Sequence, residues 1–457
     1  MPLRSRSSAR GPRHWRRCQV VAAAAAAAAV LAACDAGHPG PGATTPTATA
    51  SSPATVATGA LPDCLAGVPV ACYSPAQFRV AYGITPLLDR GIDGRGETVV
   101  LPEVAPPSGQ PGTTDIRQDL ALFDRRFGLP PVHLEVNTQL AGSVSPYLAS
   151  NEEMGDAEMV HAVAPGAAIA IILLIQGHID ADFAPMLRLA ATLGGEVSLS
   201  IGKGEGCFTS AGASALNAVL QTAREQDVTV IAASGDNGAA SIPCNGVTAP
   251  APQKGVNLPA SSPLVLAVGG TNLQASRTTG AYQDETAWND PIPPAEERQL
   301  PADAEPATAS NGGFSSLFPR PSYQAGIPGI GSARGVPDVA GDASLYTGMA
   351  VVQDVGGKAA IFPSDGTSAG APFWAGIIAL ADQYAGRHLG FVNPAIYRIG
   401  RSRAYHRAFH DITTGDNTVT YPGGTVTGYR AAPGWDPVTG WGTPDAQALV
   451  PLLATGG

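Results

Sequence analysis

The chain has 457 residues, of which 44% are hydrophobic and 14% are charged. This balance excludes an intrinsically disordered protein and, with the many glycines and prolines, suits a globular α/β fold with tight turns. The formal net charge is -10 at pH 7, so a nucleic-acid partner is excluded, because phosphate binding needs the opposite sign. An acidic surface also fits work at low pH, where protonation would neutralise much of its charge.

The N-terminus has the pattern of an export signal. Six arginines precede an apolar run from Val20 to Ala33 that is too short to span a bilayer comfortably. The run ends in Leu31-Ala32-Ala33-Cys34, which is similar to a bacterial lipobox and implies cleavage before Cys34 and a lipid on its sulfur. We expect residues 1–33 to be a lipoprotein signal peptide and the protein to lie on the extracellular face of the bacterial cell membrane. A plain signal peptide with a secreted product, or a twin-arginine signal at Arg16-Arg17, are the alternatives.

Residues 34–60 are predicted to form a flexible tether, because from position 35 onward they contain almost no large apolar side chain. Foldable sequence begins near Leu61, and we expect one domain over residues 61–457. Within it, the stretch from Asn289 to Asn311 is rich in Pro, Ala and Glu and indicates a surface insertion.

Export implies an oxidising environment in which cysteines can pair. Four of the six cysteines remain once Cys18 and Cys34 are set aside, and they allow three pairings. We favour the local pairing, Cys64 with Cys72 and Cys207 with Cys244, because each pair brackets a short stretch of chain.

Short apolar runs alternate with helix-like stretches through the predicted domain. The runs are Thr98–Val104, Ala168–Ile175, Val197–Ile201, Val228–Ala233 and Leu264–Val268, and the helix-like stretches include Thr114–Phe127, Phe183–Leu193 and Ala213–Glu225. This alternation predicts an α/β fold in which a mostly parallel sheet is flanked by helices on both faces. Active sites of such folds gather at the carboxyl ends of the strands.

Ser368 is the first candidate for chemistry. The segment Gly366–Gly370 fits the G-x-S-x-G nucleophile elbow, but that fold needs a later Asp, a later His and a strand running straight into the serine. The apolar stretch Ala369–Ala385 instead predicts a buried helix with Ser368 at its N-terminus and Pro372 in its first turn. Backbone N–H groups would then face an anion forming at the serine. The plain alternative is a serine that only caps the helix.

Carboxylates provide the next candidates. Glu152 and Asp156 are spaced i, i+4 and would share one helix face, where a pair of acids can share a proton and raise one pKa. A solvated acidic helix start would give the same pattern. Asp236 directly follows an apolar run and so stands at a strand's carboxyl end, although a simple turn of Asp, Asn and Gly also fits. His161 lies among apolar neighbours and is interpreted as a core histidine.

Two further acids near the C-terminus, Asp411 and Asp436, flank a loop rich in glycine and threonine. Two carboxylates together with backbone carbonyls could form an oxygen site of the kind that Ca²⁺ prefers, although the pattern is not an EF-hand. Taken alone, this pattern is not specific for a metal.

Together, and in this order, these segments resemble the sedolisin family of serine-carboxyl peptidases. The resemblance implies a subtilisin-like α/β fold and hydrolysis of peptide bonds, in peptide or protein substrates, at acid pH. It covers most of residues 72–445 and is carried by Tyr73–Gln77, Gly91–Gly96, Glu152–Ala167, Ser198–Gly202, Ser234–Asp236, Gly312–Ser315, Pro337–Val339, Gly366–Ala369 and Gly434–Gly440.

The resemblance also implies a role for each candidate residue. Ser368 corresponds to the nucleophile, Glu152 to the general base and Asp156 to the carboxylate behind that base. Asp236 corresponds to the acid of the oxyanion hole. The ligands of one calcium ion would be the carboxylates of Asp411 and Asp436 and the backbone oxygens of Ile412, Ala432 and Gly434.

Two departures from the family pattern stand out. The family usually carries a long N-terminal propeptide that assists folding and inhibits the enzyme, whereas only the tether is expected before the domain here. Position 201 is Ile, where some members place a tryptophan near the carboxylates.

Two other functions compete with a carboxylate-based peptidase. A subtilisin-type Ser-His-Asp protease needs a histidine in a motif such as H-G-T-x-V-A, and none of the eight histidines has that setting. A catalytically inactive, calcium-stabilised surface-binding lipoprotein is the alternative outside enzymes, and the four filled catalytic positions argue against it. We expect a monomer that meets the membrane through its lipid anchor.

Overall fold

The computed structural model describes residues 72–107, 109–142, 144–175, 179–244, 253–291, 307–421 and 424–456. The predicted signal peptide, Cys34, the tether and Cys64 lie outside the described residues. All described residues belong to the unit formed by residues 38–457. Among them, no helix combines the length and the apolar character that a membrane span requires.

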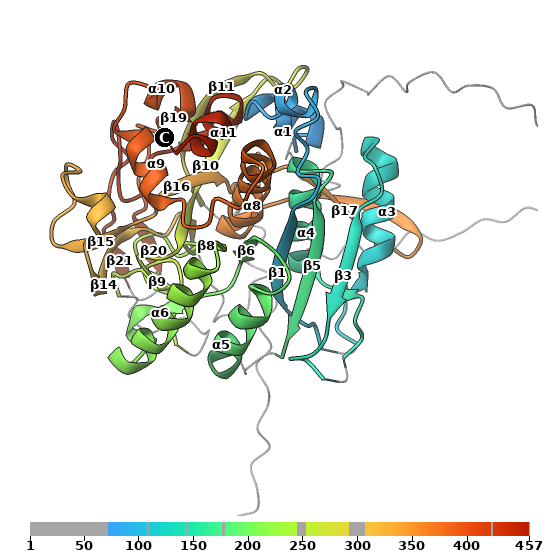
Figure 1. The fold of residues 1–457 in the computed structure, drawn as a ribbon, viewed down its shortest axis with the longest axis horizontal. Helices are drawn as coiled ribbons and strands as arrows, with labels where there is room; N and C mark the ends of the chain where they lie inside the picture. Colours follow the sequence, from blue (N-terminus) through green and yellow to red (C-terminus); the bar gives the residue numbers. More distant parts are fainter. Residues whose placement is uncertain are drawn as a thin grey trace, which may run out of the picture. The chain divides into compact units, whose positions relative to one another are not determined.

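Among the described residues, an eight-stranded sheet forms the centre of the fold (Figure 1). Its members are β1 (Thr98–Val104), β3 (His133–Asn137), β5 (Ala168–Leu174), β6 (Glu196–Leu199), β8 (Thr229–Ala233), β10 (Leu266–Ala275), β11 (Tyr282–Ala287) and β16 (Val339–Asp342). They follow the order β11-β10-β8-β6-β1-β5-β3, and β16 also pairs with β10. Every pairing is parallel except that of β10 with β11. The predicted mostly parallel sheet is confirmed.

Each of the five predicted apolar runs forms a strand of this sheet. The prediction for β10 ended too early, at Val268, whereas the strand continues to Ala275. Beyond the apolar run it pairs with β11 on one side and β16 on the other, so tertiary pairing extends it. The edge strand β3 was not predicted, because its residues are largely accessible and carry no apolar run.

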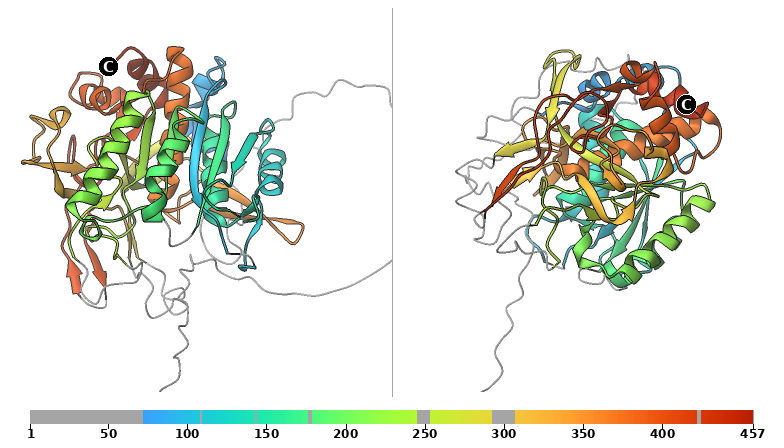
Figure 2. Two further views of the ribbon diagram at one scale, coloured as in Figure 1. Left: turned by 60° about the horizontal axis from the view of Figure 1, so that its bottom comes forward. Right: turned by 90° about the vertical axis from the view of Figure 1, so that its left-hand side faces the viewer.

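Helices cover both faces of the sheet, as Figure 2 shows for α5 and α6, which lie side by side on one face. In β1, Val99 and Leu101 pack into the core that includes α4 and α8, while Val100 packs into a second core with α5 and α6. This alternation follows from the period of two along a strand. The helices are α1 (Pro75–Ala81), α2 (Thr85–Leu88), α3 (Ile116–Phe127), α4 (Asn151–Val163), α5 (Ile179–Ala190), α6 (Ser210–Glu225), α8 (Gly366–Ala385), α9 (Asn393–Gly400), α10 (Tyr405–Ala408) and α11 (Ala446–Ala454).

Short two-stranded sheets lie outside the central sheet. They are β2 (Thr114–Asp115) with β4 (Leu148–Ala149), β7 (Lys203–Gly204) with β9 (Asn257–Leu258), β12 (Asn289–Pro291) with β13 (Ala307–Ala309), β14 (Gly313–Pro319) with β15 (Ala333–Val336), β17 (Ala350–Val355) with β18 (Lys358–Pro363), β19 (Phe409–His410) with β22 (Thr443–Pro444), and β20 (Val419–Tyr421) with β21 (Gly424–Val426). The predicted surface insertion was drawn too wide, because Ser310 and Asn311 at its end are fully buried.

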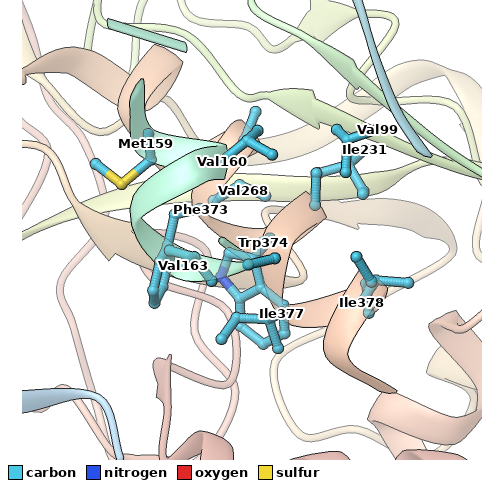
Figure 3. Packing of buried hydrophobic residues seen from close by; sticks show 14 of the residues in the cluster. Val99, Met159, Val160, Val163, Ile231, Val268, Phe373, Trp374, Ile377 and Ile378 are labelled. Carbon is cyan, nitrogen blue, oxygen red and sulfur yellow. The ribbon is translucent and has the colours of Figure 1, made fainter. Parts of the chain in front are cut away.

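The buried helix α8 packs directly against α4 and the sheet (Figure 3). A Cβ at Gly376 would lie 2.7 Å from the Cβ of Val163, so glycine at this position is what allows the two helices to come so close. The indole N–H of Trp374 donates to the carbonyl of Ala340 at 2.8 Å and so links α8 to strand β16 of the sheet. The packing sets the first turn of α8 beside the first turn of α4.

Candidate active site

The first turn of α8 carries Ser368, whose helix begins at Gly366, two residues earlier. Pro372 therefore lies in the second turn, and the expectation of a first-turn proline was wrong. Because proline has no N–H, the carbonyl of Ser368 lacks its usual helical partner. The hydroxyl of Ser200 lies 3.3 Å from that carbonyl oxygen and donates over 2.6 Å to Oδ2 of Asp156. Ser200 thus connects the serine's backbone to a carboxylate.

The N-terminal half of α4 carries three acids near Ser368, namely Glu152, Glu153 and Asp156. Ser150 caps this helix, and its backbone N–H donates to Oε2 of Glu153 at 2.7 Å, so Glu153 is occupied by the cap. Glu152 and Asp156 share the neighbouring face, as their spacing predicts. Glu152 hydrogen-bonds the side chain of Ser368. The structure therefore brings the expected nucleophile and base into direct contact.

A third acid extends this pair and was missed from the sequence. Glu103 lies in β1, is 1% exposed and hydrogen-bonds Asp156. Its signal in the sequence was a lone glutamate within an otherwise apolar run that was predicted to be a buried strand. Glu152, which contacts the serine, therefore lies in one acidic group with Asp156 and Glu103, and the charge of Asp156 acts on Glu152.

Burial changes the proton affinities of all three acids. It raises the pKa of Asp156 to about 7, although hydrogen bonds with Ser200 and Glu103 act in the opposite direction. The pKa of Glu103 rises well above its ordinary value for the same reason and through repulsion from Asp156. Glu152 is accessible to water on one side, yet desolvation by the surrounding protein and the charge of Asp156 still raise its pKa. The three carboxyl groups together therefore retain protons beyond the range of an ordinary acid.

Asp236 lies in the loop after β8 and contacts Thr367, the residue before the serine. The backbone N–H and the hydroxyl of Thr367 donate to its Oδ1 at 2.8 and 2.7 Å. Burial raises the pKa of Asp236, while the two hydrogen bonds from Thr367 lower it. A Cβ at Gly366, where φ is +74°, would lie 2.8 Å from Oδ2 of Asp236. Glycine therefore leaves room for that second oxygen, which is the atom free to hold a proton.

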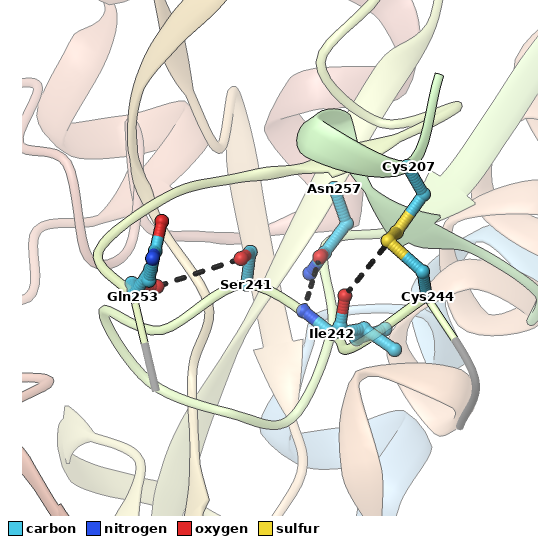
Figure 4. The surroundings of a disulfide bond; sticks show 6 residues. All are labelled: Cys207, Ser241, Ile242, Cys244, Gln253 and Asn257. Carbon is cyan, nitrogen blue, oxygen red and sulfur yellow. Dashed lines mark hydrogen bonds between the residues drawn. A yellow bond between two sulfur atoms is a disulfide. The ribbon is translucent and has the colours of Figure 1, made fainter. Parts of the chain in front are cut away.

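The predicted disulfide between Cys207 and Cys244 is present next to the loop of Asp236 (Figure 4). The bridged segment includes Ile242, whose N–H donates to Oδ1 of Asn257 at 2.8 Å. Asn257 in turn donates from Nδ2 to the carbonyl of Ser234 at 2.9 Å. The bridge is thus linked to the backbone just before Asp236. Cys72 is also disulfide-bonded, and its expected partner Cys64 lies outside the described residues.

The competing serine-hydrolase arrangements do not match this geometry. The strand before the Ser368 motif, β18, belongs to a separate antiparallel pair and not to the central sheet. Among the described residues, no histidine hydrogen-bonds to Ser368. His161 is fully buried with Nε2 2.9 Å from the carbonyl of Pro130, in agreement with its interpretation as a core histidine. Ile201 packs with the α5/α6 core.

The expected calcium residues also come together. Asp411 Oδ1 accepts hydrogen bonds from the hydroxyl of Tyr405 at 2.8 Å and from the N–H of Gly434 at 3.0 Å. Asp436 is 2% exposed, and its Oδ1 accepts the N–H groups of Val438 and Thr439 at 2.8 and 2.9 Å. Burial raises the pKa of Asp436 to about 7. A cation beside this carboxylate would offset the cost of burying its charge.

Backbone oxygens complete the set of possible calcium ligands. In the part of the chain that the structure describes, no hydrogen-bond donor is directed at the carbonyl oxygens of Ile412, Ala432 and Gly434. Two carboxylates and three free carbonyl oxygens form the all-oxygen donor set that suits Ca²⁺. These residues therefore fit the ion that the sequence predicts.

Comparisons with known proteins identify sequences that are related to this chain. A sequence model of the subtilase family matches residues 140–390. Kumamolisin from Bacillus sp. (strain MN-32) is 33% identical over 405 residues, which cover 83% of this chain and 64% of kumamolisin. Sedolisin from Pseudomonas sp. (strain 101) is 29% identical over 357 residues, which cover 76% of this chain and 57% of sedolisin. The chain thus spans less than two thirds of the length of these curated relatives.

A solved structure is similar to this chain in its fold. Pseudomonas sedolisin, described as a serine-carboxyl proteinase complexed with two molecules of pseudo-iodotyrostatin, aligns with a TM-score of 0.67 and 26% identity. The alignment covers 84% of this chain and 98% of that one. The predicted subtilisin-like fold is confirmed.

Proposed function

Because the chain belongs to the subtilase family and, within it, to the sedolisin-type serine-carboxyl peptidases, we propose that it cleaves internal peptide bonds at acid pH through an acyl-enzyme on Ser368. The observation that carries the proposal is the hydrogen bond between Glu152 and Ser368, backed by buried Asp156. A serine hydrogen-bonded to a base, with a second carboxylate close to that base, is an arrangement that can activate a nucleophile.

In the first step, Oγ of Ser368 attacks the carbonyl carbon of the scissile bond while its proton passes to Glu152. The carbonyl electrons move onto oxygen, and the protonated Oδ2 of Asp236 donates a hydrogen bond to that oxyanion. When the tetrahedral intermediate collapses, the C–N bond breaks and Glu152 returns its proton to the leaving amine. Water then attacks the acyl-enzyme while Glu152 again takes a proton. As the bond between the acyl carbon and Oγ of Ser368 breaks, Glu152 returns that proton to Oγ, and the acid product leaves.

Asp156 and Glu103 support this cycle without touching the substrate. Asp156 lies behind Glu152, so a proton shared within the carboxylate chain allows Glu152 to change its charge at little cost. When Asp156 holds the proton it can donate to Ser200, whose hydroxyl is then free to donate to the carbonyl of Ser368. The position of the nucleophile and the protonation of the chain are thereby linked.

A peptide aldehyde tests the function directly, because its carbonyl forms a hemiacetal with an activated serine. We expect one equivalent to inactivate the protein at acid pH against a neutral peptide substrate. Because this adduct is reversible, native mass spectrometry of the intact protein at low pH should show one bound aldehyde on the parent protein and none on the Ser368→Ala protein. A protein that binds the aldehyde nowhere and cleaves no peptide would favour the inactive surface-binding lipoprotein, which the comparisons do not support.

We further propose that one calcium ion binds to the five residues of the Asp411 and Asp436 loops and stabilises the native state through ligand linkage. The ion would serve as a structural cross-link between the two loops and take no part in the reaction. Chelation should lower the melting temperature by several degrees, and excess calcium should restore it. Asp411→Asn and Asp436→Asn proteins should melt early and respond to neither treatment. If they bind calcium like the parent protein, the ion lies elsewhere.

The lipid anchor is our proposal for the location of the enzyme. Cys34 would carry the lipid after the signal peptide is removed and would hold the domain at the outer face of the membrane. A Cys34→Ser protein should appear in the culture medium or soluble fraction and lose its label from a radioactive or clickable fatty acid. Retention of the Cys34→Ser protein in the membrane would contradict the anchor while leaving the peptidase proposal untouched.

A further inference from the structure

A second group of titratable side chains lies at the end of α8 opposite to Ser368. Asp382 is in the last turn of this helix, and His388 follows it. Glu97 and Glu196 stand at the amino ends of β1 and β6. Glu103 and Asp236 of the candidate active site, in contrast, lie at the carboxyl ends of strands. The four side chains are therefore on the other edge of the sheet and take no part in the proposed reaction.

The four side chains converge on one point. One ligand atom from each lies within 4.8 Å of all the others. Nδ1 of His388 is 3.3 Å from Oδ2 of Asp382 and 3.5 Å from Oε2 of Glu97. Ligands about 2.0–2.1 Å from a tetrahedral metal ion would be separated by roughly 3.3–3.4 Å, close to these distances. The arrangement thus has the dimensions of a four-ligand metal site.

Glu196 supplies an independent observation at this point. Its side chain is 0% exposed, and no N–H or hydroxyl donor of another described residue reaches either of its carboxylate oxygens. The hydrogen-bonding contact of its carboxyl group is with the carboxyl group of Asp382, so without a cation these two acids must share a proton. Oδ2 of Asp382 and Oε2 of Glu97 are buried without an N–H or hydroxyl donor as well. Across the described ranges, no lysine or arginine lies within ion-pair distance of these three carboxylates, whose only basic neighbour is His388. Buried charges of one sign need a counter-charge.

We propose that Glu97, Glu196, Asp382 and His388 bind a divalent transition-metal ion, with Zn²⁺ as the best match. One imidazole and three carboxylates form the mixed nitrogen and oxygen set that suits zinc, whereas calcium is bound by oxygen alone. His388 is about half exposed, with 48% of its side chain accessible, so the ion has a path in from solvent. The ion would join β1, β6 and the C-terminal end of α8.

The protein leaves little space around the imidazole of His388. A Cβ at Gly195 would lie 2.0 Å from Nδ1 of His388, so this glycine makes room for the imidazole beside Glu196. Asp382 is held in turn by the N–H of Leu389, which donates to its Oδ1 at 3.2 Å and leaves Oδ2 directed at the cluster. When a hydrogen bond holds one oxygen of a carboxylate, its second oxygen is oriented to bind a metal ion.

The test uses the full chain with Ser368→Ala as background, so that self-cleavage does not interfere and activity is not the readout. After removal of metals with a chelator, equilibrium dialysis against Zn²⁺ at pH 7.5 should load one ion at this site. Glu196→Gln and His388→Ala should each weaken that binding by roughly tenfold or more. Zn²⁺ should raise the melting temperature of the background protein and leave that of the His388→Ala protein unchanged.

Two matched controls separate this site from others. Glu158→Gln removes a different fully buried acid and should bind Zn²⁺ like the background protein. Asp436→Asn alters the calcium loops and should also leave zinc binding intact. The proposal is wrong if Zn²⁺ binds the His388→Ala and Glu196→Gln proteins as it binds the background. It is equally wrong if Glu196→Gln stabilises the metal-free protein and no zinc binds, since the acids then share a proton instead. Neither outcome bears on the peptidase function.

Discussion

Replacing Ser368 with alanine is expected to lower kcat/KM by about 10⁴-fold or more while the fold remains intact. The hydroxyl oxygen is the atom that forms the acyl-enzyme, and loss of a serine nucleophile leaves only the smaller contributions of binding and the oxyanion hole. Ser368 lies in the first turn of a helix that is buried through most of its length, so removing one partly exposed oxygen should not disturb the packing. Single-turnover hydrolysis of a neutral peptide at acid pH measures the effect, with circular dichroism as the check on folding.

Glu152→Gln should be nearly as damaging as the loss of the nucleophile, because an amide cannot accept the proton of Ser368. Its neighbour Glu153 offers a matched control. Glu153 serves the helix cap, and glutamine can fill the same capping role, so Glu153→Gln should retain most of the activity. Wild-type rates in a folded Ser368→Ala or Glu152→Gln protein would overturn the assigned roles. A loss in Glu153→Gln equal to that in Glu152→Gln would indicate a general effect of charge.

The central strands and helices could be predicted from the sequence because their signals are local. Apolar runs such as Ala168–Ile175 form buried strands, and the period of two along them sends alternate side chains to the two cores. The spacing of Glu152 and Asp156 predicts a shared helix face for the same reason. Motif order then gave the remaining catalytic residues through the family resemblance, without any knowledge of distances.

Groups that depend on contacts between distant segments could not be predicted in this way. Glu103 and Ser200 join Asp156 from two different strands or their ends, and nothing in the local sequence ties them to it. The group of Glu97, Glu196, Asp382 and His388 is assembled from three elements at one edge of the sheet. A charged residue within or beside a buried apolar run was the available signal in both cases, since such a residue must find a partner after folding.

The second large effect is expected in the pH profile, which should peak in the acid range where Glu152 can accept a proton while Asp236 still holds one, and fall steeply toward pH 7. The oxyanion accepts a hydrogen bond only while Asp236 is protonated. Burial raises the pKa of Asp236 above its usual value, so the protonated form persists into mild acid and is lost as the pH rises further. Beyond that point, kcat/KM should fall about tenfold per pH unit for one essential proton. A histidine-based protease would show the opposite trend, because acid protonates its base.

Asp236→Asn tests whether loss of the Asp236 proton causes the fall of kcat/KM toward pH 7, which is the alkaline limb of the pH profile. Oδ1 must still accept the two hydrogen bonds from Thr367, so the amide nitrogen takes the place of Oδ2 and donates at every pH. The variant should therefore keep a larger fraction of its peak activity at pH 7 to 8 than the parent protein does. Asp236→Ala is the matched control without a donor, and it should lose roughly 10²- to 10³-fold at all pH values.

Stability must be followed at each pH, because the same burial that tunes the site also changes the free energy of unfolding. Burial raises the pKa of Glu285 to about 7 and that of Asp342 to about 8. The native state thus binds more protons than the unfolded chain, and the stabilisation from these groups is complete below about pH 4 and is lost as the pH rises toward 7 or 8. Glu285 and Asp342 lie outside the site, so Asp236→Asn should not alter this loss. If the Asp236→Asn protein remains folded at pH 7 and still shows the alkaline limb of the parent, Asp236 is not the group that titrates. A parent maximum at pH 7 to 9 would exclude the carboxylate mechanism altogether.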